Sequence, residues 1–130
     1  MNSDDAISTT QDTRELTFRN SIARWLVVVS LGLLMCGYLA IAGAWIYAFQ
    51  TERIPNVADA AQYSRTGHGP WDHVSDLAQI VEHGMAAPFF AMIPALASML
   101  VRRRTFTAVL IGVCIISWLA LMYTHFWLID

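Results

Sequence analysis

Charge is scarce in this chain. Of its 130 residues only 14% are charged and 56% are hydrophobic, whereas a soluble domain carries about 25% charged residues. A chain of this length cannot form a core large enough to hide so much apolar side chain, so a soluble globular domain is excluded. The same hydrophobicity excludes a disordered chain. A net charge of −2 gives no general attraction to nucleic acid.

Several signatures of chemistry are also missing. The sequence has no Gly-rich phosphate loop, no Ser-His-Asp set, no zinc-protease motif, and neither His-x-x-His nor Cys-x-x-Cys spacing. Both cysteines, Cys36 and Cys114, fall within apolar runs, where a thiol usually acts as a small packing group. These absences favour a chain that is not an enzyme on its own.

Three long apolar runs are the main positive feature. They cover residues 25–49, 80–101 and 105–129, and each has the roughly 20 residues that a helix needs to cross the hydrocarbon layer. Continuous runs favour helices over barrel strands, because a helix satisfies its own backbone in lipid. The sequence therefore predicts an all-α integral membrane protein. Residues 1–20 are expected to form a flexible cytoplasmic tail, and residues 21–130 one three-helix membrane domain with an outer loop at 50–79.

Arginine predicts the orientation. The chain has no lysine, and six of its eight arginines either precede the first run or separate the second run from the third. The positive-inside rule places both clusters in the cytoplasm and the C-terminus outside. The expected location is a bacterial inner membrane, and the expected topology anchors are Arg24, Arg102, Arg103 and Arg104.

Small residues predict where helices pack. In lipid, helices associate through close backbone approach along small side chains, since burial of apolar surface contributes little there. Either these residues hold the three helices together, or one face docks another membrane subunit or a second copy of the chain. The predicted packing residues are Gly32, Cys36, Ala40 and Ala44 in the first run, Gly84, Ala91 and Ser98 in the second, and Gly112 in the third.

The segment before the second run has a polar and an apolar face. Asp72, Asp76, Gln79 and His83 recur at helical spacing on one side. The pattern predicts an amphipathic helix over 70–81, which either lies on the membrane surface or continues into the second span. Pro88 and Pro94 predict a kink farther along that span.

The four histidines all fall in the predicted outer half. His83 and His125 lie about 27 and 30 Å above the inner ends of their helices, and hence near one level. The simplest interpretation is a polar and aromatic belt at the lipid headgroups. Three alternatives stay open: His83 and His125 could ligate a b-type haem, polar groups at this level could bind a quinone, or a metal ion could be held by His73, Asp76, Glu82 and His83.

Three functional hypotheses follow. The first is a small non-catalytic accessory subunit of a larger membrane complex, which the short chain and the small-residue faces favour. The second is a haem- or quinone-associated anchor of an electron-transfer complex that uses His83 and His125. The third is a membrane regulator or immunity-type protein that binds its partner through the loop at 50–79.

The orientation can be tested with two matched single cysteines. In a chain that carries Cys36→Ser and Cys114→Ala, we expect Gln62→Cys to react with a membrane-impermeant maleimide in intact cells. Gln11→Cys should react only after lysis, because it precedes the first span on the arginine-rich side. The reverse labelling pattern would show that the N-terminus lies outside.

Overall fold

A computed structural model describes residues 3–102 and 105–129 of the chain. These ranges contain no strand and four helices: α1 Ser3–Gln50, α2 Val57–Thr66, α3 Ser75–Val101 and α4 Thr105–Leu128. Within them the segments Gln11–Gln50, Asp76–Val101 and Thr105–Leu128 are long and apolar enough to cross a membrane. The predicted all-α membrane fold with three spans is thereby confirmed.

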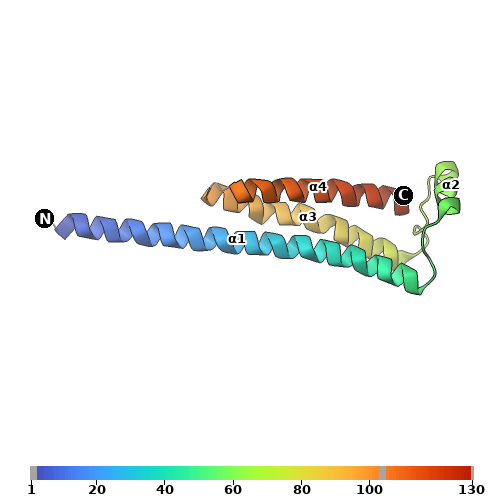
Figure 1. The fold of residues 1–130 in the computed structure, drawn as a ribbon, viewed down its shortest axis with the longest axis horizontal. Helices are drawn as coiled ribbons and strands as arrows, with labels where there is room; N and C mark the ends of the chain where they lie inside the picture. Colours follow the sequence, from blue (N-terminus) through green and yellow to red (C-terminus); the bar gives the residue numbers. More distant parts are fainter. Residues whose placement is uncertain (1–2, 103–104, 130) are drawn as a thin grey trace.

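The helix α3 occupies the centre of the structure. It packs against α1 on one side and α4 on the other, and Figure 1 shows it running between them. The short helix α2 lies at the end of the bundle where α1 and α4 finish, while α1 continues past the α3–α4 turn toward the N-terminus (Figure 1). This arrangement leaves much of α1 without a neighbouring helix.

The helix α1 starts far earlier than the first apolar run. The segment at 1–20, expected as a flexible tail, is helical from Ser3 onward and continuous with the span. The physical reason is that residues 3–31 contain neither glycine nor proline. Extending an existing helix adds one hydrogen bond per residue and avoids the cost of a new nucleus.

The outer loop contains the unpredicted helix α2. Asn56 caps it: its Oδ1 accepts hydrogen bonds from the N–H groups of Ala58 and Asp59 at 2.8 and 3.1 Å. The Asp59 carboxylate in turn accepts from the Asn56 N–H at 2.7 Å, which completes a capping box. Gly67 ends the helix with a left-handed φ of 71°, a conformation that glycine adopts without steric cost. Asn-x-x-Asp followed by glycine is the sequence signal for this helix.

The helix α3 begins at Ser75, five residues after the predicted start at Pro70. Residues 70–73 form a turn instead, since tertiary contacts of Gly69 and Trp71 hold this segment against the end of α4. From Ser75 the helix runs unbroken into the span, so the amphipathic segment continues the second span. Pro88 and Pro94 lie within α3, which remains helical through both to Val101.

The α1–α3 interface follows a repeat of seven residues. Gly37 meets Gly84, and a Cβ at Gly37 would lie 2.9 Å from the Gly84 carbonyl oxygen. One repeat toward the end of the bundle where α3 meets α4, which we call the inner end after the predicted orientation, the Ser30 hydroxyl donates to the Ala91 carbonyl at 2.7 Å. One repeat farther, the Ser98 hydroxyl donates to the Ala23 carbonyl at 3.0 Å.

Steps of seven keep the contact on one side of both helices, as in an antiparallel coiled coil. The hydroxyl bonds add about 0.6 kcal/mol each by the average for membrane helices. The interface therefore depends on two glycines at the crossing and on serine bonds toward the inner end.

The crossing can be tested with two glycines of the same helix. We expect Gly37→Leu to lower the free energy of unfolding in detergent by about 1–3 kcal/mol or more, because the new side chain collides with α3 backbone. Gly32→Leu should be nearly neutral, since nothing lies within 4 Å of a Cβ built there. Equal losses in an SDS-titration measurement would contradict this packing.

Candidate functional site

At the end of the bundle where α2 lies, which we call the outer end after the predicted orientation, His68 and His73 flank one carboxylate. Their Nδ1 atoms lie 3.0 and 3.8 Å from Oδ2 of Asp72, and their ring centroids are 6.5 Å apart. Together with Asp59 and Gln62 of α2, the two histidines line a cavity of about 90 Å³. Both imidazoles are largely exposed, so water screens these contacts and their net contribution to stability is small.

His83 has a defined hydrogen-bonding state. Its Nδ1 lies 2.7 Å from the Gln79 carbonyl oxygen on the same helix. A carbonyl oxygen only accepts, so this contact is a hydrogen bond when Nδ1 carries the proton, and in that tautomer of the neutral ring Nε2 keeps its lone pair. The side chain is exposed on α3. This state is the one that a ligand to a metal or a haem iron requires.

His125 lies on the last turn of α4 and is half-buried. Its ring centroid is 6.0 Å from that of Phe126, and the two planes meet at 85°. Neither His125 nor His83 lines the cavity between α2 and the two histidines His68 and His73. A haem bound between the two imidazoles would need both rings to face the same space. Their similar height along the two helices does not establish this.

The four residues predicted to hold a metal ion do not form a cluster of ligands. Across the described residues, no group of three or more His, Cys, Asp or Glu side chains is placed to hold a metal. The reason lies in the backbone: His73 belongs to the turn before α3, while Asp76, Glu82 and His83 are spread over the first turns of that helix. Glu82 points about 100° around the helix from His83.

Trp71 is the central residue of the outer end. Its side chain is fully buried, its indole Nε1–H donates to the Arg53 carbonyl at 3.0 Å, and its backbone N–H donates to the Leu128 carbonyl at 2.8 Å. The Trp45 ring meets it edge-on at 5.3 Å. Trp71 thus joins the ends of α1 and α4 to the turn before α3, through its indole on one side and its backbone N–H on the other. Gly69 is required beside it, because a Cβ there would overlap the Leu128 backbone.

The predicted packing residues divide into three groups by exposure. Ala44, Gly84, Ala91 and Ser98 are buried, whereas Ala40 and Gly112 are half-buried. Gly32 and Cys36 are exposed instead. A spacing of four residues advances about 40° per step around a helix, so a row of this kind winds from the covered side of α1 to the open side.

The sequence interpretation missed Gly37, Ser30 and Ala23, which make the contacts at the crossing and toward the inner end. All three are buried. With Ala44 they form a series of small residues spaced by seven, and that spacing is the signal that would have identified the interface.

The open side of α1 carries small residues of its own. Gly32, Cys36 and Gly43 fall within about 40° of one another at 100° per residue, and all three are exposed. Nothing lies within 4 Å of a Cβ built on either glycine. We call these three residues the outward small face of α1.

The inner end is marked by arginines. Arg24 is exposed on α1. The backbone N–H of Arg102 caps α3 by donating to the Ser98 carbonyl, and Arg19 donates from its guanidinium to the Val101 carbonyl at 3.2 Å. These bonds satisfy carbonyls that the end of α3 leaves unpaired. The other two predicted anchors, Arg103 and Arg104, lie outside the described residues.

The role of Trp71 can be tested by removing one donor. We expect Trp71→Phe to leave the Arg53 carbonyl without its partner and to lower the free energy of unfolding by about 1–3 kcal/mol. Amide hydrogen exchange over residues 51–56 and 67–74 should become faster. Trp25→Phe is the matched control, since Trp25 is 68% exposed. Unchanged exchange in Trp71→Phe would contradict the role of Trp71 as a link between these segments.

Comparisons with protein-family models, with curated proteins and with solved structures found no match to this chain. Its function is therefore inferred from its own geometry.

Proposed function

We propose that this chain is a small, non-catalytic accessory subunit of a larger membrane complex, and that it docks on a transmembrane helix of its partner through the outward small face of α1. The observation that carries the proposal is the presence of two sets of small residues on one helix. The set at Gly37 and Ala44 is buried within the chain, whereas Gly32, Cys36 and Gly43 are exposed, and a Cβ built on either of these two glycines meets nothing within 4 Å.

Glycines on a lipid-facing helix surface need an explanation. A glycine in a helix costs about 1 kcal/mol relative to alanine, and lipid tails gain nothing from a missing side chain. A second helix does gain, because small residues let two backbones approach and pack closely. The outward small face has the composition and the spacing for such a contact.

The inner part of α1 supports the same proposal. The helix has 48 residues, or about 72 Å of length, against a hydrocarbon layer of about 30 Å. Its N-terminal part extends past the end of the α3–α4 pair (Figure 1). Leu16 and Phe18 are 58% and 67% exposed on that extension. A partner subunit that covers these side chains would stabilise the part of α1 that precedes its contact with the end of α3 at Arg19.

A haem- or quinone-associated role in electron transport is the second candidate. The observation that favours it is the His83 hydrogen bond to Gln79, which leaves Nε2 as the free ligand or acceptor atom. This role would add a cofactor to the accessory subunit. For a haem, the test is absorption: a Soret band that is lost in His83→Ala would support it.

The accessory role can be tested on the full chain, affinity-tagged and purified in mild detergent from the cells that make it. Native mass spectrometry should find a larger membrane subunit at fixed stoichiometry. We expect the double substitution Gly32→Leu and Gly43→Leu to reduce the retained partner by about tenfold or more, since a loss of 1.4 kcal/mol is a factor of ten.

Gly112→Leu on α4 is the matched control, because nothing lies within 4 Å of a Cβ there either. It should retain the partner. Isolation of the wild-type chain alone, or only with copies of itself, would overturn the accessory role. Equal retention by the double variant would show that the partner binds elsewhere, with the exposed α2 loop at 50–79 as the next surface to test.

A further inference from the structure

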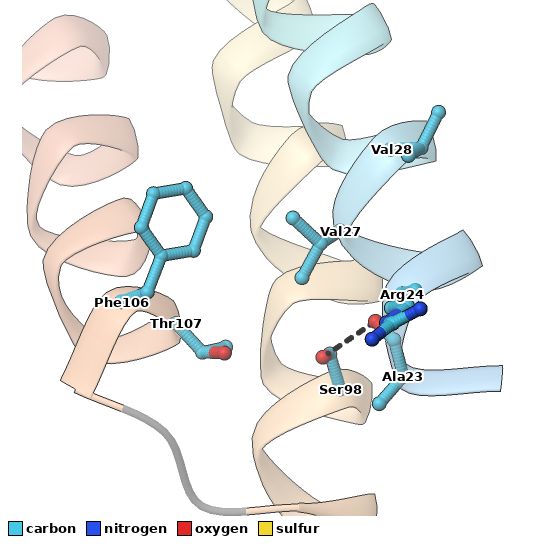
Figure 2. Close-up of a pocket in the computed structure, with 7 residues that line it drawn as sticks. All are labelled: Ala23, Arg24, Val27, Val28, Ser98, Phe106 and Thr107. Atoms are coloured by element: carbon cyan, nitrogen blue, oxygen red, sulfur yellow. Dashed lines mark hydrogen bonds between the residues drawn. The ribbon is translucent and has the colours of Figure 1, made fainter. Parts of the chain in front are cut away.

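A cavity of about 350 Å³ opens near the inner end of the bundle. It lies where α1 and α4 stand apart on either side of α3, as Figure 2 shows. Its volume is at the lower end of the range for ligand pockets, so it would hold part of a long molecule. Its walls come from all three long helices and include Ala23, Arg24 and Val27 of α1, Ser98 of α3, and Phe106 and Thr107 of α4.

The hydroxyl of Thr107 is the unusual group in this cavity. Thr107 is only 1% exposed, and its Oγ1 has no hydrogen-bond partner among the residues that the structure describes. A threonine inside a helix commonly donates back to a carbonyl of the preceding turn, as Thr124 does to Ala120 at 3.0 Å, whereas Thr107 lies in the first turn of α4 and has no preceding turn in the described chain. In Figure 2 the Thr107 side chain points instead into the space between α4 and the other two helices. A buried hydroxyl without a partner is unfavourable, so a ligand atom that accepts its proton would stabilise the site.

The other polar groups of the cavity define the ligand further. The Ser98 hydroxyl already donates to the Ala23 carbonyl at 3.0 Å. Arg24 lies on the same rim and is exposed, so its guanidinium can meet an anion at the headgroup level. The remaining wall is apolar, from Val27, Val28 and Phe106. The site therefore combines a cation, one free hydroxyl donor and an apolar channel.

We propose that this cavity binds an anionic phospholipid of the arginine-rich leaflet. The Arg24 guanidinium pairs with the lipid phosphate, the Thr107 hydroxyl donates to an ester carbonyl of the glycerol backbone, and the start of one acyl chain lies against Val27, Val28 and Phe106. Basic pockets between helices on the cytoplasmic side suit anionic headgroups in this way. A quinone would use the Thr107 hydroxyl but would leave the guanidinium of Arg24 without a partner of opposite charge.

The test uses the full chain in detergent with added dioleoyl phosphatidylglycerol, and with dioleoyl phosphatidylcholine for comparison. Native mass spectrometry should detect one retained phosphatidylglycerol per chain. Arg24→Gln is expected to weaken its binding by about tenfold, as for the loss of one charge-assisted hydrogen bond. Thr107→Val keeps the shape of the side chain but removes the donor, and should weaken the binding of both lipids about threefold to tenfold.

Two matched variants control for general effects. Arg14→Gln removes a charge from α1 outside the cavity, and Thr124→Val removes a hydroxyl that is already paired. Both should bind lipid as the wild type does. The thermal midpoint adds a second measurement: without lipid Thr107→Val should melt higher than the wild type, because the unpaired hydroxyl is gone. Added phosphatidylglycerol should remove that difference.

Three results would overturn the proposal. The first is equal retention of phosphatidylglycerol by the wild type, Arg24→Gln and Thr107→Val. The second is displacement of the lipid by millimolar inorganic phosphate, which would identify a free-anion site. The third is preferential binding of a short-chain quinone that Arg24→Gln leaves unchanged, which would identify a neutral carbonyl ligand.

Discussion

The close approach of α1 and α3 at Gly37 and Gly84 determines where the rest of the chain can lie. In lipid the apolar side chains gain little by meeting one another, so the pair depends on backbone proximity and on the hydroxyl bonds toward the inner end. Because α1 covers one side of α3, the helix α4 takes the other side. The two outer helices then stay apart, bridged by the hydroxyls of Tyr38 and Ser117 at 2.5 Å. The open side of α1 and the inner cavity both result from this arrangement.

The sequence was sufficient to predict the fold class, but not to predict which face of each helix packs against its neighbour. A bilayer demands about 20 apolar residues per span and satisfied backbone groups, so the three runs predicted three helices directly. The interface of α1 was harder to predict, because this helix carries two series of small residues, one spaced by four and one spaced by seven. The two series share Ala44 and then follow different sides of the helix. Only the row spaced by seven stays on one side of a helix pair. Gly32 and Cys36 belong to the other row and therefore face outward.

The outer end shows a different limit of sequence reasoning. Periodicity placed Asp76, Gln79 and His83 on one polar side of the segment, and all three are exposed on α3, while Leu77 and Val81 between them are buried. It could not show that the turn before α3 is fixed by the end of α4, because that contact joins residues more than fifty positions apart in the chain. The histidines illustrate the same point. Height along a helix follows from counting residues, whereas direction around the helix depends on which face the neighbours cover, and His83 falls on an uncovered one.

Two unfavourable local features, the glycines at positions 32 and 43 and the unpaired hydroxyl of Thr107, are not offset by a contact within the described chain. At Gly37 and Gly84 the missing side chains are required, since a Cβ at either position would collide with the other helix. At Gly32 and Gly43 no such contact offsets the unfavourable helix propensity of glycine. At Thr107, in the first turn of α4, a buried hydroxyl has no hydrogen-bond partner among the described residues. Departures from local preference tend to mark functional positions. Because one departure is a missing side chain and the other a missing acceptor, each suits a different one of the two proposed partners: a helix against α1 and a carbonyl-bearing amphiphile beside α4.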